Sequence, residues 1–385
     1  MSEYQFYEFQ AVDRPLTQAE MTELRSYSSR ARITPTSFIN EYNWGNFKGD
    51  SDEWMEKYFD AFLYVANWGS HRLKFRIPVR LLDSEAAADY CTEETFFFHS
   101  KGDHALLSFF SEDESGGWEE GDGWLASLAP VRNDLMRGDY RGLYLGWLLA
   151  AQQGQLDDDT LEPPVPPGLG ELSEPLRGLG DFLRLDEDLI AAAAEASAPQ
   201  SATALSRAEM ERWAAALSVE EREGVVVTLL LGENPHLSEE LKQRAMRELH
   251  GEASSGDHAR RSARRTVGQL LARAQTIAAK RQKKEAEARA REKAKLEREQ
   301  AEKREKHLVS LIGSEESLWL RISEMILTKQ PRRYDEAVSL LQDLRDVADL
   351  TGQGREFISR LWVLRLENTR KPSFIRRLDK AGLMG

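Results

Sequence analysis

The chain has 385 residues, of which 41% are apolar, and its formal net charge is −13. This is enough apolar material for a sizeable core, and the length indicates two or three domains. No run of about 18 apolar residues occurs, and the first residues lack the basic and apolar regions of a signal peptide, so we expect a cytoplasmic protein without a membrane span. Cys91 is the only cysteine, which excludes an internal disulfide and multi-cysteine zinc sites, and its alanine-rich surroundings favour a buried thiol.

Residues 1–155 have the pattern of an α+β domain. Thr17 with Glu20 three residues later forms a capping box, and Asp50 with Glu53 offers a second helix start. A third short helix is expected at 84–90. Aromatic and β-branched runs indicate strands at 4–9, 33–42, 61–66, 72–77, 95–99 and 105–110.

The apolar period changes from two to about 3.6 after an acidic loop at 112–122. Apolar residues between Leu135 and Leu149 predict one buried helix that closes the first domain. The acidic and proline-rich stretch 156–170 then predicts a stiff connector and a domain boundary, because consecutive prolines favour extended geometry and cannot continue a helix.

Residues 171–256 are expected to form a small helical bundle. Ser206 with Glu209 and Ser218 with Glu221 satisfy the capping-box pattern. The expected helices lie near 172–184, 187–196, 207–217, 219–231 and 238–250.

A strongly basic stretch follows at 260–306, where 17 Lys and Arg face 7 Glu. It carries +10, so the rest of the chain carries −23. We expect one long charged helix over 257–310. Its beginning, 266–279, keeps an apolar stripe that should pack on another element, whereas 280–306 retains only alanines and Leu296. Glu and Lys or Arg four residues apart should support this second part, each pair by about 0.2 to 0.5 kcal/mol.

Two interpretations of the basic helix stay open. In the first, basic side chains contact phosphates of DNA or RNA, which gives affinity without base specificity. In the second, the helix is a solvated spacer, or packs against the acidic part of the protein. The nucleic-acid interpretation assigns contacts to Arg260, Arg261, Arg264, Arg265, Lys280, Arg281, Lys283 and Lys284, together with Arg376, Arg377 and Lys380 of the C-terminal segment.

Residues 311–385 predict a C-terminal helical domain. Leu318, Ile322 and Met325 repeat at four and three residues, as do Ala337, Leu341 and Leu344. This spacing indicates stacked helices that pack on one another.

No motif of catalysis or cofactor binding is present: the chain lacks a phosphate loop, a dinucleotide glycine fingerprint, a GxSxG elbow and an HExxH helix. His99 and His104 flank a turn and are candidate metal ligands. Histidines at hairpin ends are, however, typically exposed and bind no metal. We therefore predict no cofactor and no metal. An enzyme would need a dispersed active site in the N-terminal domain.

Two segments resemble bacterial proteins. The stretch from Tyr334 to Asp346 and the stretch from Arg370 to Leu383 together resemble the tail of some bacterial SWIM zinc-finger proteins, over about the last 70 residues. The zinc motif CxC…CxH is missing here, so the resemblance implies a shared partner or system, without the metal. Residues 4–9 and 13–16 resemble uncharacterised bacterial proteins.

These observations favour a non-enzymatic adaptor or scaffold whose C-terminal helices dock a protein partner. The alternative is a sequence-nonspecific nucleic-acid-binding protein that uses the basic helix. An enzyme with a dispersed active site is the third hypothesis.

Overall fold

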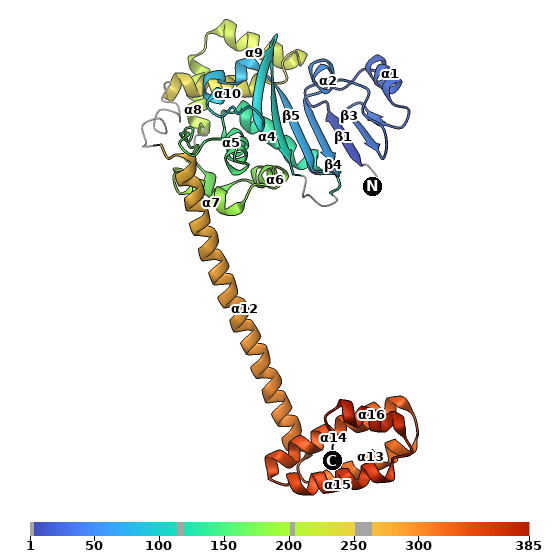
Figure 1. The fold of residues 1–385 in the computed structure, drawn as a ribbon. Helices are drawn as coiled ribbons and strands as arrows, with labels where there is room; N and C mark the ends of the chain where they lie inside the picture. Colours follow the sequence, from blue (N-terminus) through green and yellow to red (C-terminus); the bar gives the residue numbers. More distant parts are fainter. Residues whose placement is uncertain (1–3, 114–118, 201–204, 251–263, 385) are drawn as a thin grey trace. The chain divides into compact units, whose positions relative to one another are not determined.

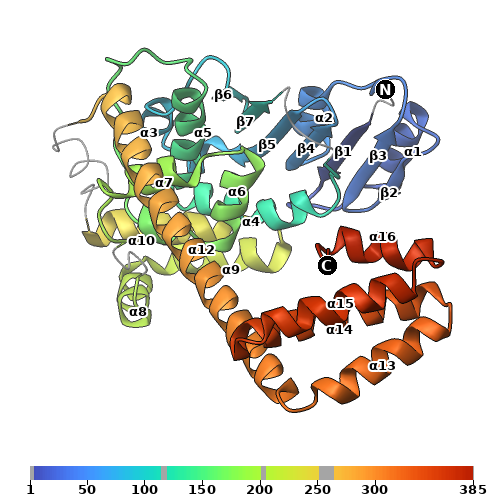
Figure 2. The ribbon, with the colours of Figure 1, turned by 60° about the horizontal axis from the view of Figure 1, so that its bottom comes forward.

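The computed structural model describes residues 4–113, 119–200, 205–250 and 264–384, and it divides into two compact units, residues 1–281 and 282–385. Figures 1 and 2 label the elements of both. An antiparallel sheet opens the chain and helices follow it, which confirms the predicted α+β region followed by all-α regions with a long helix. Within the described ranges, no helix combines the length and the apolar character needed to cross a membrane.

One seven-stranded antiparallel sheet, in the order β2-β3-β1-β4-β5-β7-β6, forms the framework of the first unit. The run predicted as one strand at 33–42 is two strands, because residues 35 and 36 form a tight turn that pairs Thr34 with Ser37. The strands are β1 (Gln5–Gln10), β2 (Arg32–Thr34), β3 (Ser37–Tyr42), β4 (Ala61–Ala66), β5 (Ser70–Pro78), β6 (Phe96–Lys101) and β7 (His104–Glu112).

Both faces of the sheet are covered, and β4 shows why. All six of its residues are buried. Successive side chains of a strand point to opposite faces, so Leu63 and Val65 enter one core while Phe62 and Tyr64 enter the other. The second core lies under α1 (Gln18–Tyr27) and α2 (Ser51–Lys57), whose starts carry the predicted caps at Thr17 and Asp50. The short helix α3 (Ser84–Ala88) is followed by Cys91, which is exposed rather than buried as expected.

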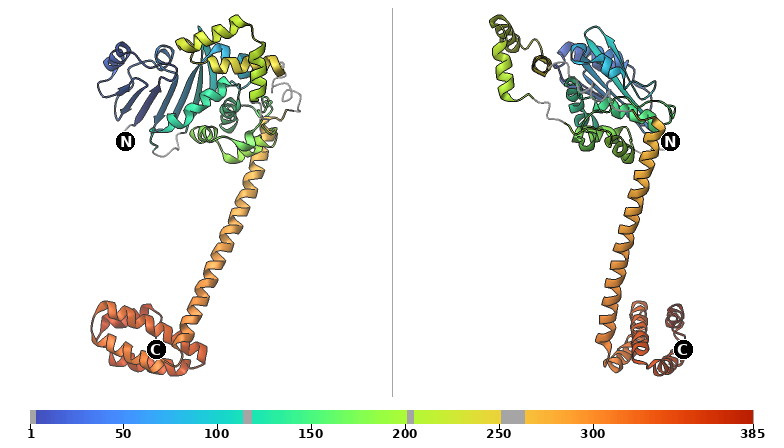
Figure 3. Two further views of the ribbon diagram at one scale, coloured as in Figure 1. Left: turned by 180° about the vertical axis from the view of Figure 1, so that it is seen from behind. Right: turned by 90° about the vertical axis from the view of Figure 1, so that its left-hand side faces the viewer.

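The single helix expected between 135 and 149 is two helices. The first, α4 (Trp124–Met136), ends where Gly138 adopts a left-handed φ of 79°, and α5 (Arg141–Gln152) begins immediately afterwards. The helix α4 lies across one face of the sheet (Figure 3). Together with α5, which is buried from Arg141 to Ala151, it fills the larger core.

The stretch 156–170, expected to be an exposed connector between domains, instead belongs to the first unit. Pro163, Pro164 and Pro166 are buried. Prolines lack an N–H but keep their carbonyls, and these accept hydrogen bonds: Tyr90 Oη donates to Pro164 O (2.8 Å) and Ser197 Oγ to Pro166 O (2.7 Å). The predicted boundary therefore does not coincide with the division of the structure after residue 281.

The helices expected between 171 and 256 are all present, but they form two groups rather than one bundle. In the first group, α6 (Glu174–Phe182) and α7 (Glu187–Ala194) add their apolar side chains to the core under α4 and α5. The second group is α8 (Arg207–Ala216), α9 (Val219–Leu231) and α10 (Leu237–His250), of which α8 and α10 share a small cluster around Trp213 and Ala245. Both predicted capping boxes, at Ser206 and Ser218, are confirmed.

The long helix is α12 (Val267–Leu311), of 45 residues. At about 1.5 Å per residue it is about 68 Å long. It begins ten residues later than the predicted 257, and residues 257–263 lie outside the described part of the chain.

The second unit contains the end of α12 and four further helices: α13 (Glu315–Leu327), α14 (Pro331–Thr351), α15 (Gly354–Glu367) and α16 (Pro372–Lys380). The helix α14 contacts the other three (Figure 2). Their shared core contains Leu318, Ile322, Leu341 and Leu344, which were expected to pack from their spacing.

Candidate interaction surfaces

The first turns of α12 are anchored in the core of the first unit. Val267, Leu270 and Ala274 are buried there, which confirms that the apolar stripe of 266–279 packs on another element. Just before the helix, Thr266 forms an isolated antiparallel bridge with Leu161. The stretch 156–170, predicted to be a connector, thus pairs with the residue that precedes α12.

Arg265, predicted to contact phosphates, lies in a buried ion pair instead. Its Nε and Nη2 each donate to the carboxylate of Glu162 over 2.8 Å, and Glu162 is only 1% exposed. Tyr144 Oη donates to the same carboxylate. Burial and the neighbouring Glu162 raise the pKa of Tyr144 well above its ordinary value, so the phenol stays protonated. Arg265 is therefore engaged inside the protein.

Two more arginines near this end of α12 pair with carboxylates in α7 and at its C-cap. Arg273 forms a bidentate pair with Glu195 (2.6 Å), and Arg281 pairs with Asp188 (2.7 Å). The hydrogen bond from Arg281 lowers the pKa of Asp188. Arg264 Nε donates to the backbone oxygen of Glu162. Arg264 and Arg281, both predicted to contact phosphates, thus already contact other residues of this chain.

Three of the remaining predicted contacts are lysines of α12. Lys280, Lys283 and Lys284 are exposed. Arg260 and Arg261 lie outside the described residues. Among the predicted contacts at 260–284 that the structure describes, these three lysines are exposed, whereas Arg264, Arg265 and Arg281 contact other residues of the first unit.

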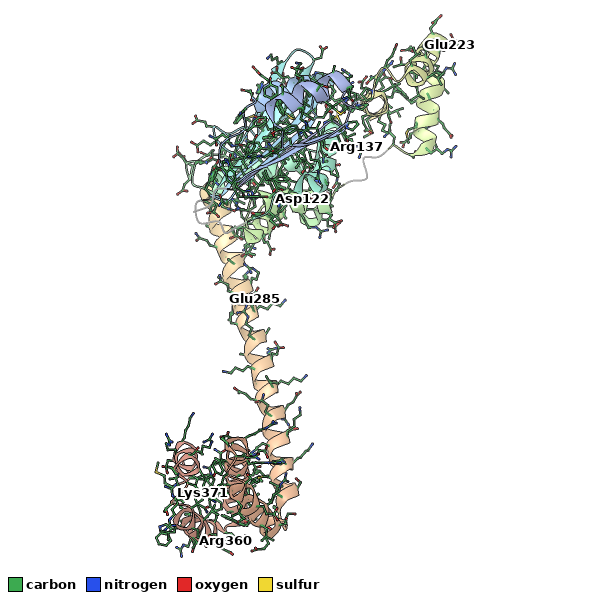
Figure 4. The ribbon with its side chains drawn as sticks, turned by 90° about the vertical axis from the view of Figure 1, so that its right-hand side faces the viewer. Asp122, Arg137, Glu223, Glu285, Arg360 and Lys371 are labelled. Carbon is green, nitrogen blue, oxygen red and sulfur yellow. The ribbon has the colours of Figure 1, made fainter. Side chains whose placement is uncertain are left out.

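Every residue from 282 to 306 is exposed, and side chains surround this part of α12, among them Glu285 (Figure 4). It carries ten basic and seven acidic residues. One Glu-first pair of the expected spacing, Glu285–Arg289, is present at 3.8 Å. Other pairs four residues apart, such as Arg298–Glu302 (3.1 Å), have the basic residue first. Pairs of this kind support an isolated helix and leave little net positive charge.

The other end of α12 is anchored in the second unit. Leu308 is buried, and Arg304 pairs with Asp343 and, over 2.7 Å, with Asp346. His307 Nε2 lies 3.1 Å from Asp343. The helix therefore has packed, ion-paired ends and an exposed middle.

The C-terminal basic residues fall into two classes. Arg377 pairs with Asp335 over 2.6 Å, so it holds α16 on α14. Arg376 and Lys380 are exposed.

A groove between α15 and α16 was missed by the sequence analysis. It has a volume of about 460 Å³ and is lined by Trp362, Arg365, Leu366, Thr369, Pro372, Ile375 and Arg376. The helix α15 buries Phe357, Leu361 and Leu364 and turns Ile358, Trp362 and Leu366 outward, with Trp362 55% exposed. The sequence held one signal of this groove: apolar residues occupy two faces of α15, whereas a helix that packs on one side has a single apolar face.

The helix α9 presents a second exposed apolar surface. None of its residues is buried, and Val226, Leu229, Leu230 and Leu231 are 51 to 78% exposed. The sequence predicted this helix but not its exposure. Exposed apolar patches mark interaction sites more often than scattered single residues do.

The first unit also contains a buried cluster of charges. Arg132, 2% exposed, donates to Asp13 (2.7 Å), and His236 Nε2 lies 2.9 Å from the same carboxylate. Burial alone would raise the pKa of Asp13, but hydrogen bonds from His236 and Arg132 outweigh it and lower that pKa below its usual range. Arg76 pairs with Asp60 over 2.6 Å beside this cluster.

These charges hold the start of α10 on the sheet domain. Arg137 with Glu239 (3.1 Å) and Arg80 with Glu240 (2.5 Å) extend the same contact, and Figure 4 labels Arg137. The cluster is therefore a structural junction. Among the residues that the structure describes, no three His, Cys, Asp or Glu side chains are grouped as metal ligands.

Comparisons of this chain with protein-family models, with curated proteins and with solved structures found no match.

Proposed function

We propose that this protein is a non-enzymatic adaptor of the cytoplasm that acts through protein–protein contacts, with a protein partner docked on the C-terminal helices. The groove between α15 and α16 carries this proposal. An exposed tryptophan and arginines beside an apolar groove are the residue types that dominate binding energy in protein interfaces. Trp362, Leu366 and Ile375 supply the apolar floor there, and Arg365 and Arg376 the polar edge.

In this proposal α12 is a spacer. Three arginine contacts support that role because they neutralise positive charge within the first unit: Arg265–Glu162 just before α12, and Arg273–Glu195 and Arg281–Asp188 on it. The exposed middle keeps its helix through local ion pairs and propensity.

Sequence-nonspecific binding of nucleic acid is the second candidate function. The exposed lysines Lys280, Lys283 and Lys284 favour it, as do Arg376 and Lys380. Seven glutamates on the exposed part of α12 oppose it, because they dilute the field that attracts phosphates.

Affinity capture from the native host, with and without nuclease, tests the adaptor function. The full-length chain is the bait, alongside a Trp362→Glu variant and a Leu327→Glu control that changes an even more exposed apolar residue, in α13. We expect a protein that the wild type and the control retain, that nuclease does not release, and that Trp362→Glu loses. Capture that depends on nucleic acid, or that ignores Trp362, contradicts the proposal.

A further inference from the structure

The outward face of α9 has the pattern of a docking helix. Val219, Val226 and Leu230 are seven and four residues apart, which places them on one face, and they are 60%, 51% and 78% exposed. On the opposite side, Glu221 forms an ion pair with Arg244 of α10 (3.0 Å). A helix with one side attached and an apolar side exposed suits insertion into a groove.

The groove between α15 and α16 has the complementary character. Its apolar lining, Trp362, Leu366 and Ile375, lies beside Arg376, whose guanidinium donates to Pro372 O and forms no ion pair with the described residues. Arg370, in the loop between the two helices, is exposed and likewise unpaired within the described ranges.

Charge also matches between the two surfaces. The helix α9 carries three glutamates and one arginine. Glu223, labelled in Figure 4, lies on the outward face between Val219 and Val226 in the sequence. It has no ion pair in the described part of the chain. An acidic and apolar helix thus faces solvent on the same chain that presents a basic and apolar groove.

We propose that the outward face of α9 of one copy docks in the groove between α15 and α16 of a second copy. This inference rests on the proposed adaptor function and names a second copy of the chain as a partner of the groove. The contact is heterologous, since it joins two different surfaces, so each copy offers one helix and one groove.

The test is the mass of the full-length chain by analytical ultracentrifugation from micromolar to millimolar concentration. We expect mass to rise with concentration. Leu230→Glu, which alters the helix, and Trp362→Glu, which alters the groove, should each weaken association about 30-fold or more, as expected for residues that dominate an interface. Leu296→Glu, at an exposed leucine in the middle of α12, is the matched control and should leave association unchanged.

Mixing the two variants separates this arrangement from other self-association. The Leu230→Glu chain keeps its groove and the Trp362→Glu chain keeps its helix, so an equimolar mixture should form a 1:1 dimer that neither variant forms alone. A smaller test uses charge: Glu223→Arg or Arg376→Glu alone should weaken association about two- to five-fold, and mixing chains that carry one reversal each should recover it. Circular dichroism of each variant must match the wild type.

A wild-type chain that stays monomeric throughout overturns the inference, as does a mixture that fails to associate. Neither outcome affects the adaptor function if Trp362→Glu still loses a partner from the host. Self-association that Trp362→Glu leaves intact also overturns the inference, because it must then use another surface, such as α9 against α9.

Discussion

Replacing Arg265 with alanine would break the buried ion pair that fixes the start of α12. Glu162 is 1% exposed and accepts two hydrogen bonds from Arg265, so the variant leaves a buried carboxylate with only Tyr144 as donor among these partners. Removing one member of a buried pair costs about 3 to 5 kcal/mol. The side chain of Arg265 is 22% exposed, which puts the expected loss at the lower end, about 3 kcal/mol.

The assay is urea unfolding of the full chain, followed by a probe of the first unit such as tryptophan fluorescence. A loss of about 3 kcal/mol moves the midpoint by about 1 M when the slope is near 3 kcal/mol/M. Arg273→Ala, eight residues further along the chain in α12, is the matched control. Its partner Glu195 is 44% exposed, so water screens this pair and the loss should be clearly smaller than that of Arg265→Ala.

Adding Glu162→Gln to Arg265→Ala should recover part of the stability, because the unpaired charge is then removed. If Arg265→Ala costs no more than Arg273→Ala, then Arg265 is not an anchor, and its availability for phosphate contacts must be reconsidered.

Three further results are expected. Burial lowers the pKa of His71, whose Nδ1 lies 2.8 Å from Phe182 O. The contribution of His71 to stability is therefore complete above about pH 6.5 and is lost as the pH falls from there through the lower folded-state pKa. An unfolding free energy that stays flat from pH 7.5 to 5, or that falls equally in His71→Gln, would argue against this. Limited proteolysis of the native chain should spare residues 163–167, and early cleavage there by mass spectrometry would show that this segment is exposed after all. Asp343→Asn should lower the melting temperature of the second unit by loosening Arg304, whereas an unchanged melting temperature would mean that this end of α12 is held by apolar contacts alone.

Local patterns in the sequence predicted most elements of the fold. The capping boxes at Thr17, Ser206 and Ser218 lie within four residues, so they survive any tertiary arrangement. The strand 61–66 was equally clear because its six apolar residues suit a strand buried on both faces. The helix α4 was not predicted: Pro130 lies in its interior, and proline normally argues against a helix.

Features that depend on distant partners could not be predicted. Proline-rich composition suggested an exposed connector, yet the carbonyls of Pro164 and Pro166 find donors on Tyr90 and Ser197. In the same way, a count of positive charges treats Arg265 like Lys283. Only the fold shows that Arg265 meets a buried carboxylate while Lys283 is exposed.

The candidate site shows the same limit. The residues that line the groove come from the end of α15, the following loop and α16, and their spacing alone does not reveal a shared surface. Trp362 and Leu366 fit the interior of a helical stack as well as they fit an exposed groove. The prediction that the C-terminal helices dock a partner therefore named no docking residues, and it stays a prediction that variants of the groove residues can test.

The most direct test of the central proposal is a titration of mixed-sequence duplex DNA with the full-length protein near physiological salt. If α12 is a spacer and the protein acts through protein contacts, no binding tighter than about 100 μM should appear, the weak end of ordinary nonspecific affinity. Tight binding that weakens log-linearly with salt, and that is lost when Lys280, Lys283 and Lys284 are reversed to glutamate, would contradict the adaptor function and establish the nucleic-acid alternative.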